Sequence, residues 1–168
     1  MIQSFSLQGK RESNEDKHIG ILNLNNDNPS INMVNMVGVF DGHGGKLVSK
    51  FLKANLPKYI FKKTNINIYQ QKTKLTSRFF GKLFDKLQED LIKHHPIASK
   101  RCGSTALVGV QYVDKLNNNT IWLANVGDSR AVLYNHKDVV IPLTTDHKPN
   151  SVAEKKRIEK LGGKIKFD

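Results

Sequence analysis

The chain has 168 residues, of which 38% are hydrophobic and 25% charged, and its 27 Lys and Arg outnumber 15 Asp and Glu to give a net charge of +12. This length suits a single domain, and the hydrophobic share is enough to build a core, which excludes a disordered chain of low hydrophobicity. The longest apolar runs have four or five residues, glycine included, which is too short for a membrane-spanning helix.

The amino-terminal residues and the cysteine content predict where the protein works. Residues 1–7 are too few for the apolar region of a signal peptide, and charged residues follow from Lys10 onward. A single cysteine, Cys102, excludes an internal disulfide and fits a reducing compartment. We therefore expect an intracellular protein, cytoplasmic or nuclear, with no signal peptide, no transmembrane segment and no membrane partner.

The first half of the chain predicts a strand pair followed by two helices. His18–Leu22 and Met36–Phe40 have strand character, and the polar, Asn-rich residues 23–35 between them are typical of a hairpin loop. Beyond the glycines at 42–45, apolar residues recur at helical spacing up to Pro57. A second helix is predicted by five apolar residues that lie four apart, namely Leu75, Phe79, Leu83, Leu87 and Leu91.

The second half predicts two antiparallel hairpins and a final helix. The strands are expected at 104–110 and 120–126, joined by a turn at 117–119, and at 130–134 and 139–143, joined by a turn at 135–137. Ser151 and Glu154 have capping-box spacing, and the helix that they begin carries Ile158 and Leu161 inward before it stops at Gly162. This order of elements indicates an α+β fold with an antiparallel sheet.

The positive charge is concentrated in one segment. Residues 46–101 hold 14 Lys and Arg against three Asp and Glu. Such a segment can form a basic face for nucleic acid, an acidic membrane or a phosphorylated partner, or it can be the solvated surface of two amphipathic helices. We favour the solvated surface and do not expect a nucleic-acid partner.

Asp41 is the strongest candidate for a residue that binds a metal ion, because it follows a predicted strand and precedes a Gly-His-Gly-Gly run. Hard divalent cations prefer carboxylate and carbonyl oxygens, and a glycine-rich turn lets a main-chain carbonyl reach an ion. Asp-Gly is also a common turn without further function. The glycines match neither the dinucleotide-binding nor the P-loop pattern, and the chain has no G-x-S-x-G motif, so we do not expect an α/β-hydrolase.

Five motifs occur in a fixed order along the chain. They are Arg11–Asp16 (RESNED), Val39–Gly45 (VFDGHGG), Gly103–Ala106 (GSTA), Ala124–Val132 (ANVGDSRAV) and Leu143–Pro149 (LTTDHKP). Together they closely resemble the metal-dependent protein serine/threonine phosphatases of the 2C type, the PPM family. The resemblance implies an antiparallel β-sandwich flanked by helices, and a phosphoserine or phosphothreonine protein as the substrate.

The resemblance also implies a site for two Mg²⁺ or Mn²⁺ ions and assigns its residues. The implied metal ligands are Asp41, which bridges both ions, the Gly42 carbonyl, Glu15, and Asp128, which lies near a weaker third ion. Arg11 would bind the substrate phosphate and His43 would act as the general acid. A water between the two cations would then attack phosphorus directly, without a protein nucleophile.

The resemblance further predicts that residues 1–168 form a single partial domain, the amino-terminal portion of the catalytic domain, incomplete at the carboxyl-terminal end. The family's later metal-binding Asp-Gly and Asp-Asn motifs do not follow Asp128 here. Full activity would therefore need elements supplied by a second chain or by further sequence. The alternatives are a non-catalytic phosphatase-like binding module that uses Arg11 and the basic helices, and a basic nucleic-acid binder that uses residues 46–101.

Overall fold

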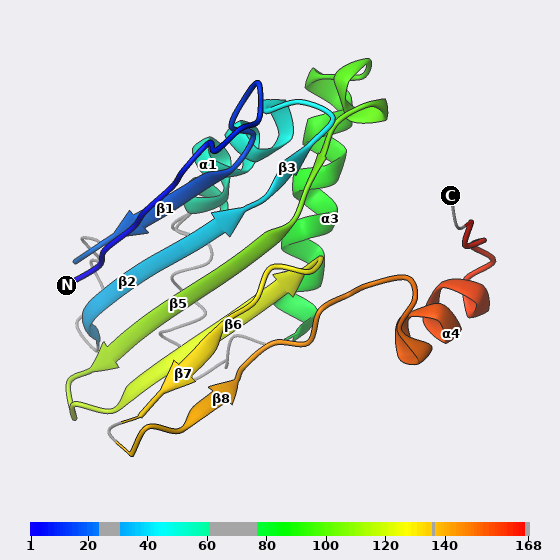
Figure 1. Ribbon diagram of the computed structural model, residues 1–168. Helices are drawn as coiled ribbons and strands as arrows, with labels where there is room; N and C mark the ends of the chain where they lie inside the picture. Colours follow the sequence, from blue (N-terminus) through cyan, green and yellow to red (C-terminus); the bar gives the residue numbers. More distant parts are fainter. Residues whose placement is uncertain (24–30, 61–76, 136, 167–168) are drawn as a thin grey trace.

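The computed structural model of the chain describes residues 1–23, 31–60, 77–135 and 137–166 (Figure 1). Its main element is a four-stranded antiparallel sheet with the order β1-β2-β5-β6, built from β1 (Lys17–Ile21), β2 (Ile31–Phe40), β5 (Ala106–Asp114) and β6 (Asn119–Val126). Two short antiparallel sheets pair β3 (Gly42–His43) with β4 (Gly103–Ser104), and β7 (Val132–Tyr134) with β8 (Val140–Pro142).

Two helices, α1 (Leu47–Ile60) and α3 (Ser77–His94), cover one face of the main sheet, as Figure 1 shows. A short 3-10 helix η1 (Ala98–Lys100) leads into β4, and α4 (Val152–Lys160) lies near the carboxyl end. The predicted α+β fold with antiparallel sheets and flanking helices is confirmed. In the described part of the chain, no helix is both long and apolar enough to cross a membrane.

The core lies between the helices and the sheet. Because side chains alternate across a strand, every second residue of β2 and β5 faces the helices, including Met36, Phe40, Val108 and Val110, which are all fully buried. Each helix contributes a stripe of buried apolar residues at helical spacing, namely Val48, Leu52, Leu56 and Ile60 from α1, and Phe80, Leu83, Leu87 and Leu91 from α3. Burying one such side chain stabilises the fold by roughly 1.5–3 kcal/mol.

The opposite face of the sheet is apolar but much more exposed. Val37 and Val39 of β2 and Ile121 of β6 each keep more than two-fifths of their surface in solvent. The first residues of the chain lie against this face, since a side chain on Gly20 would meet Ile2. A groove of about 470 Å³ runs between the amino-terminal segment and the strands.

The predicted loop at 23–35 is too long, because β2 begins at Ile31 rather than at Met36. Asn35, which suggests a loop in the sequence, is buried in the sheet with its side chain paired. Its amide donates to Gln111 over 2.8 Å, and its side-chain oxygen accepts from the Asn23 amide over 3.0 Å. Satisfied hydrogen bonds therefore allow a polar residue inside this strand.

Two details of the predicted helices are also wrong. On α3 the fully buried aromatic residue is Phe80, whereas Phe79 is half-buried, because a strict spacing of four drifts around a helix with 3.6 residues per turn. The predicted stripe's first member, Leu75, lies outside the described residues.

On α4 the Ser151 cap is confirmed, since its side chain accepts from the Glu154 amide, but Leu161 is 74% exposed rather than inward.

Candidate metal and phosphate site

The turn after β2 presents Asp41 at the end of the central strand, and close packing explains the glycine that follows. A Cβ atom on Gly42 would lie 2.5 Å from the Glu15 carbonyl oxygen and 2.9 Å from the Ser49 hydroxyl. Ser49 is fully buried near the start of α1 and donates its hydroxyl to the Glu15 carbonyl. This packing brings the segment that carries Arg11 and Glu15 against the Asp41 turn.

The rest of the glycine run is held against the segment before β4. Gly44 has a positive φ of 67°, and a Cβ atom there would stand 2.1 Å from the Arg101 carbonyl oxygen. The Cys102 thiol donates to the Gly44 carbonyl over 2.8 Å. Only glycine accommodates both the positive φ at residue 44 and the close approach of its backbone to Arg101.

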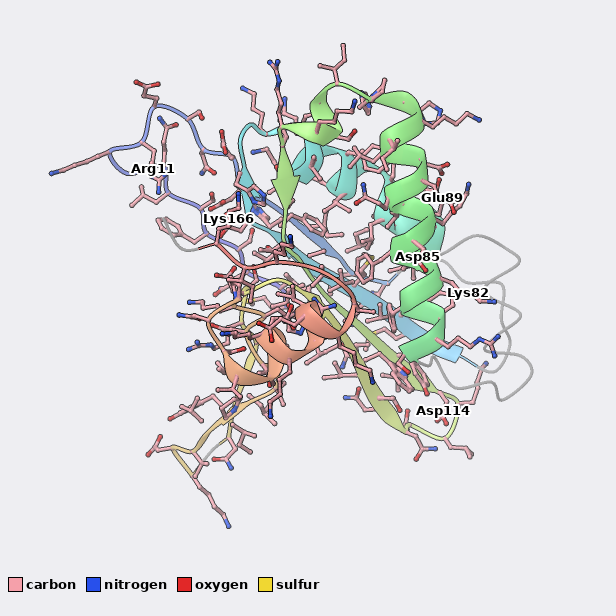
Figure 2. All side chains as sticks on the ribbon, turned by 90° about the vertical axis from the view of Figure 1, so that its right-hand side faces the viewer. Arg11, Lys82, Asp85, Glu89, Asp114 and Lys166 are labelled. Atoms are coloured by element: carbon pink, nitrogen blue, oxygen red, sulfur yellow. The ribbon has the colours of Figure 1, made fainter. Side chains whose placement is uncertain are left out.

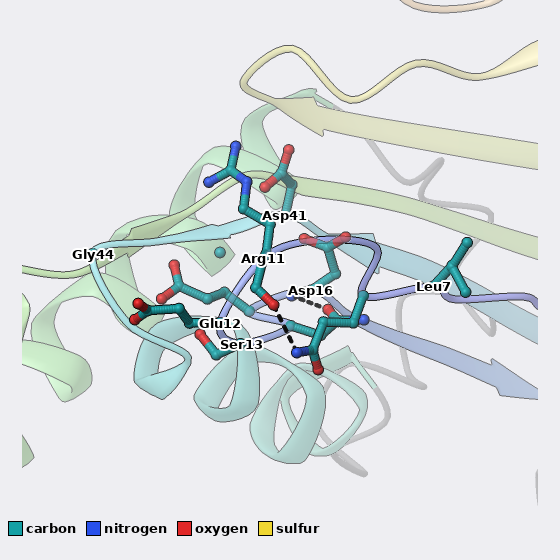
Figure 3. Close-up of a pocket in the computed structure, with 11 residues that line it drawn as sticks. Leu7, Arg11, Glu12, Ser13, Asp16, Asp41 and Gly44 are labelled. Carbon is teal, nitrogen blue, oxygen red and sulfur yellow. Dashed lines mark hydrogen bonds between the residues drawn. The ribbon is translucent and has the colours of Figure 1, made fainter.

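Four of the six predicted site residues line one hollow of about 630 Å³, namely Arg11, Glu15, Asp41 and Gly42. Figure 3 shows the side chains of Arg11, Asp16 and Asp41 around this hollow. Arg11 lies on the exposed amino-terminal segment, across the view in Figure 2 from Lys82, Asp85 and Glu89 of α3. The predicted substrate-binding arginine and three of the four predicted metal-binding residues therefore come together, and α3 lies apart from them.

The other two predicted residues, His43 and Asp128, are near Asp41 but do not line the hollow. His43 lies in β3, and its ring packs on Gly103, where a Cβ atom would be 2.3 Å from Nε2. Asp128 lies on the loop between β6 and β7, and Lys148 Nζ is 3.9 Å from one of its carboxylate oxygens. Both residues are close enough for their charges to affect Asp41.

The pKa of the Asp41 carboxyl is raised above its ordinary value. The largest cause is partial loss of hydration in the hollow, even though the side chain keeps contact with solvent, and the next are the negative charges of Asp16 and Asp128. A hydrogen bond with the Asp16 side chain raises the pKa further, whereas His43 lowers it slightly. Asp41 is thus an acid surrounded by other acids, with little compensating positive charge.

Asp16 also lines the hollow, although the sequence motifs assigned it no role. The Glu15–Asp16 pair was visible as adjacent acids, but the order of two neighbours along a chain does not show which side chain turns toward a third residue. In the structure the Asp16 amide donates to the Asn14 side chain over 2.9 Å, and the Asp16 carboxyl lies beside Asp41. The part played by Glu15 stays a prediction.

The oxygen donors around Asp41 suit a hard divalent cation in kind, since carboxylates and main-chain carbonyls are what Mg²⁺ and Mn²⁺ prefer. A cation would also offset the repulsion that raises the pKa of Asp41. In number the donors are few, because no three His, Cys, Asp or Glu side chains among the described residues converge closely enough to hold an ion by themselves.

Comparison with known proteins finds similarity to one family. The sequence model of the family described as "Protein phosphatase 2C" matches residues 2–168. "Protein phosphatase 1L" of Bos taurus is 30% identical over 98% of this chain, and "Probable protein phosphatase 2C 55" of Oryza sativa is 37% identical over 97%. The chain spans 44% and 39% of the length of these two relatives.

Solved structures show the same fold. A structure described as "a C.elegans sex determining protein" superposes with a TM-score of 0.71 at 24% identity, covering 96% of this chain and 38% of that one. The serine-threonine phosphatase 2C from Toxoplasma gondii superposes with a TM-score of 0.59 at 18% identity, covering 90% of this chain and 51% of that one. The arrangement of sheet and helices is therefore shared with proteins whose sequences are only 24% and 18% identical to this chain.

Proposed function

The chain belongs to the protein phosphatase 2C family, and from this premise we propose that the hollow around Asp41 serves the removal of phosphate from phosphoserine or phosphothreonine residues of a protein substrate. The observation that carries the proposal is the gathering of the Asp41 and Asp16 carboxylates with the Arg11 guanidinium in one hollow. Acidic groups provide the ligands for a divalent cation, and the arginine provides a binding group for the phosphate.

Arg11 binds the phosphate in this proposal. Its planar guanidinium offers a fork of donors that matches two phosphate oxygens at once. Within the described part of the chain, Arg11 takes part in none of the ion pairs, so its guanidinium is available to a substrate.

Asp41, the Gly42 carbonyl, Glu15 and Asp128 would hold the divalent cations, and Asp16 lies beside Asp41 as a further acid. Mg²⁺ or Mn²⁺ bound there would supply an acidic water as the nucleophile and positive charge at the phosphate. The residues themselves orient these groups, since Gly42 and Ser49 fix the Glu15 main chain against the Asp41 turn.

His43 is the proton donor in this proposal. When water adds to phosphorus, the bond between phosphorus and the serine or threonine oxygen breaks, and that oxygen must take up a proton. An imidazole adjacent to the site can supply it, because histidine is the side chain that most often serves as a general acid in enzymes. The packing of the His43 ring on Gly103 limits its orientation.

The test is phosphate release from a phosphothreonine peptide by the 168-residue chain in the presence of Mn²⁺. We expect release that depends on Mn²⁺, is abolished by Asp41→Asn and is weakened through a higher KM by Arg11→Ala. Asp85→Asn, on the exposed side of α3, is the matched control and should leave the rate unchanged.

Two outcomes would contradict hydrolysis by this chain. Absence of release in saturating Mn²⁺, together with Arg11-dependent binding of the same peptide, would show that these 168 residues bind a phosphoprotein but do not hydrolyse it without further elements. Release that is unaffected by Asp41→Asn would show that the activity does not come from this hollow.

A further inference from the structure

Thr105 lies where three distant segments of the chain meet. It stands between β4 and β5, is only 9% exposed, and makes two hydrogen bonds to the main chain of Asp41. The Thr105 amide donates to the Asp41 carbonyl over 2.9 Å, and the Thr105 hydroxyl accepts from the Asp41 amide over 3.0 Å. A single residue therefore holds the Asp41 backbone on both sides.

The same side chain also holds the loop that carries Asp128. The Thr105 hydroxyl is 2.7 Å from the hydroxyl of Ser129, the residue after Asp128. A threonine hydroxyl has one hydrogen and two lone pairs, so it can accept from the Asp41 amide and still form this second bond. Its methyl carbon packs on Gly127, where a Cβ atom would be only 2.7 Å away.

We propose that Thr105 is a positioning residue that sets the separation and direction of the Asp41 and Asp128 side chains, and so prepares this chain to bind a divalent cation between its acidic segments. This inference rests on the proposed function, because it assigns a role to Thr105 through the two carboxylates that the function uses. No other single side chain in the described residues hydrogen-bonds both to Asp41 and to the residues 127–129.

The physical need for such a residue follows from charge. Two carboxylates that are brought together repel each other, and their segments will separate unless the scaffold holds them. Asp41 and Ser129 lie 88 positions apart in the sequence, so no local structure sets the distance between their segments. A buried hydroxyl that bonds to both segments fixes their relative position before any ion arrives, which is how outer residues tune metal sites.

The loop at 127–129 has a second support that does not involve Thr105. The His147 amide donates to the Gly127 carbonyl over 3.0 Å, and the Gly127 amide donates to His147 Nδ1 over 3.3 Å. Loss of the Thr105 hydroxyl should therefore loosen the link to Asp41 without detaching the loop from the rest of the molecule.

The experiment compares Thr105→Val, which keeps the shape but removes the hydroxyl, with Thr105→Ser, which keeps the hydroxyl. Ser104→Ala is the matched control, because among the described residues this neighbouring hydroxyl donates to the Thr105 carbonyl and not to Asp41 or to residues 127–129. The first measurement is the Mn²⁺ dissociation constant of the full chain by calorimetry. The second is hydrogen exchange at the amides of Asp41 and Asp128.

We expect Thr105→Val to weaken Mn²⁺ binding by about 10- to 100-fold and to speed exchange at the Asp41 amide. Thr105→Ser should restore most of the affinity, and Ser104→Ala should leave both measurements unchanged. A purely structural role would instead lower the melting temperature of Thr105→Val and leave the Mn²⁺ affinity of the folded fraction intact, which would overturn the proposal.

A further variant keeps the test decisive if Thr105→Val does not fold. Ser129→Ala leaves the acceptor for the Asp41 amide in place and removes only the link to the Asp128 loop, so it should weaken Mn²⁺ binding with little effect on exchange at Asp41. Unchanged affinity in this variant would contradict the proposal.

The outcome for the unaltered chain separates this inference from the proposed function. If the unaltered chain binds no Mn²⁺, the proposed function fails, and the exchange data decide whether Thr105 links the two segments. Faster exchange at the Asp41 amide in Thr105→Val than in Thr105→Ser would then support the link, and unchanged exchange at Asp41 would refute it.

Discussion

Gly44 and Gly81 differ in what surrounds the place where a Cβ atom would be. Gly44 has a positive φ and the Arg101 carbonyl in the way, whereas Gly81 is exposed on α3 with no atom within 4 Å. We expect Gly44→Ala to lower the free energy of unfolding by about 1–3 kcal/mol, and Gly81→Ala to raise it by about 0.5–1 kcal/mol. Urea unfolding of both variants checks this, and equal effects would contradict the local geometry.

Asp146 provides a prediction about pH. Its pKa is lowered, first by the hydrogen bonds from Arg130, whose Nε and Nη2 atoms are 3.0 and 2.8 Å from the two carboxylate oxygens. A carboxyl whose pKa is lower in the folded state stabilises the fold above its unfolded pKa and loses that contribution as pH falls through its folded pKa. Asp146→Asn should therefore lower the melting temperature at neutral pH, and this difference should vanish in acid.

The measurement is a series of thermal melts from neutral to strongly acidic pH. Asp85→Asn is the control, since Asp85 lies exposed on α3 and takes part in none of the ion pairs among the described residues. A difference between Asp146→Asn and the unaltered chain that persists or grows in acid would show that Arg130 does not stabilise the ionised carboxyl.

At the scale of single residues, the motifs predicted residues that the structure brings together, but not how those residues are arranged. Arg11, Glu15, Asp41 and Gly42 line one hollow, as the order of motifs led us to expect. The proximity of Asp16 to Asp41 and the two-sided contact of Thr105 depend on how segments that are 24 to 64 residues apart pack together. No local pattern in the sequence contains that information.

The helix α3 shows how burial divides one element into two faces. Leu87 is 2% exposed and Ile92 is 51% exposed on the same helix. Leu87→Ala should destabilise the chain by about 2–5 kcal/mol because it leaves a cavity against the sheet, whereas Ile92→Ala should change stability by about 0.5 kcal/mol or less. Urea unfolding distinguishes them, and a large loss at Ile92 would mean that another surface covers that face in solution.

At the scale of helices and strands, sequence patterns predicted most of the elements but misplaced the start of β2 and the orientation of Leu161. The hairpin of β5 and β6 and the stripes on α1 and α3 follow from alternation and helical spacing. The start of β2 was missed because asparagine favours loops unless its side chain is paired, and the pairing of Asn35 with Gln111 crosses to another strand. The inward prediction for Leu161 failed because α4 has no buried residue.

At the scale of the whole molecule, net charge and the exposed sheet face act in opposite directions. The charge of +12 keeps molecules apart at low salt, while the apolar face with Val39 and Ile121 favours their association once charge is screened. The Debye length falls from ~30 Å at about 0.01 M salt to ~3 Å at about 1 M. We therefore expect self-association to increase with salt.

Sedimentation velocity at low and high salt tests this balance. Ile121→Lys should reduce association at high salt, because it places a charge on the outward face of the sheet. Leu116→Lys is the control, since Leu116 is exposed in the turn between β5 and β6. Equal reduction by both variants would show that the sheet face is not the surface involved.

The fold class could be predicted from the sequence because it depends on the order and type of elements, and these leave local periodic signals. The pairing of β2 with β5 could not be obtained in that way. The two strands lie side by side in the sheet, with Val39 opposite Leu107, although both helices and the site loop lie between them in the sequence.

The pairing of β2 with β5 also has a kinetic consequence. The chain must close a loop of about 65 residues to form this pair, whereas the hairpin of β5 and β6 closes a loop of about four residues. The longer loop is about four doublings longer than the shorter one, so closing it costs roughly 2.4 kcal/mol more in conformational entropy. Local hairpins and helices can therefore form early, while the central strand pair forms late. Asp41 lines the hollow at the end of β2 and is held there by Thr105 at the start of β5, so we expect the hollow to be completed only in a late stage of folding.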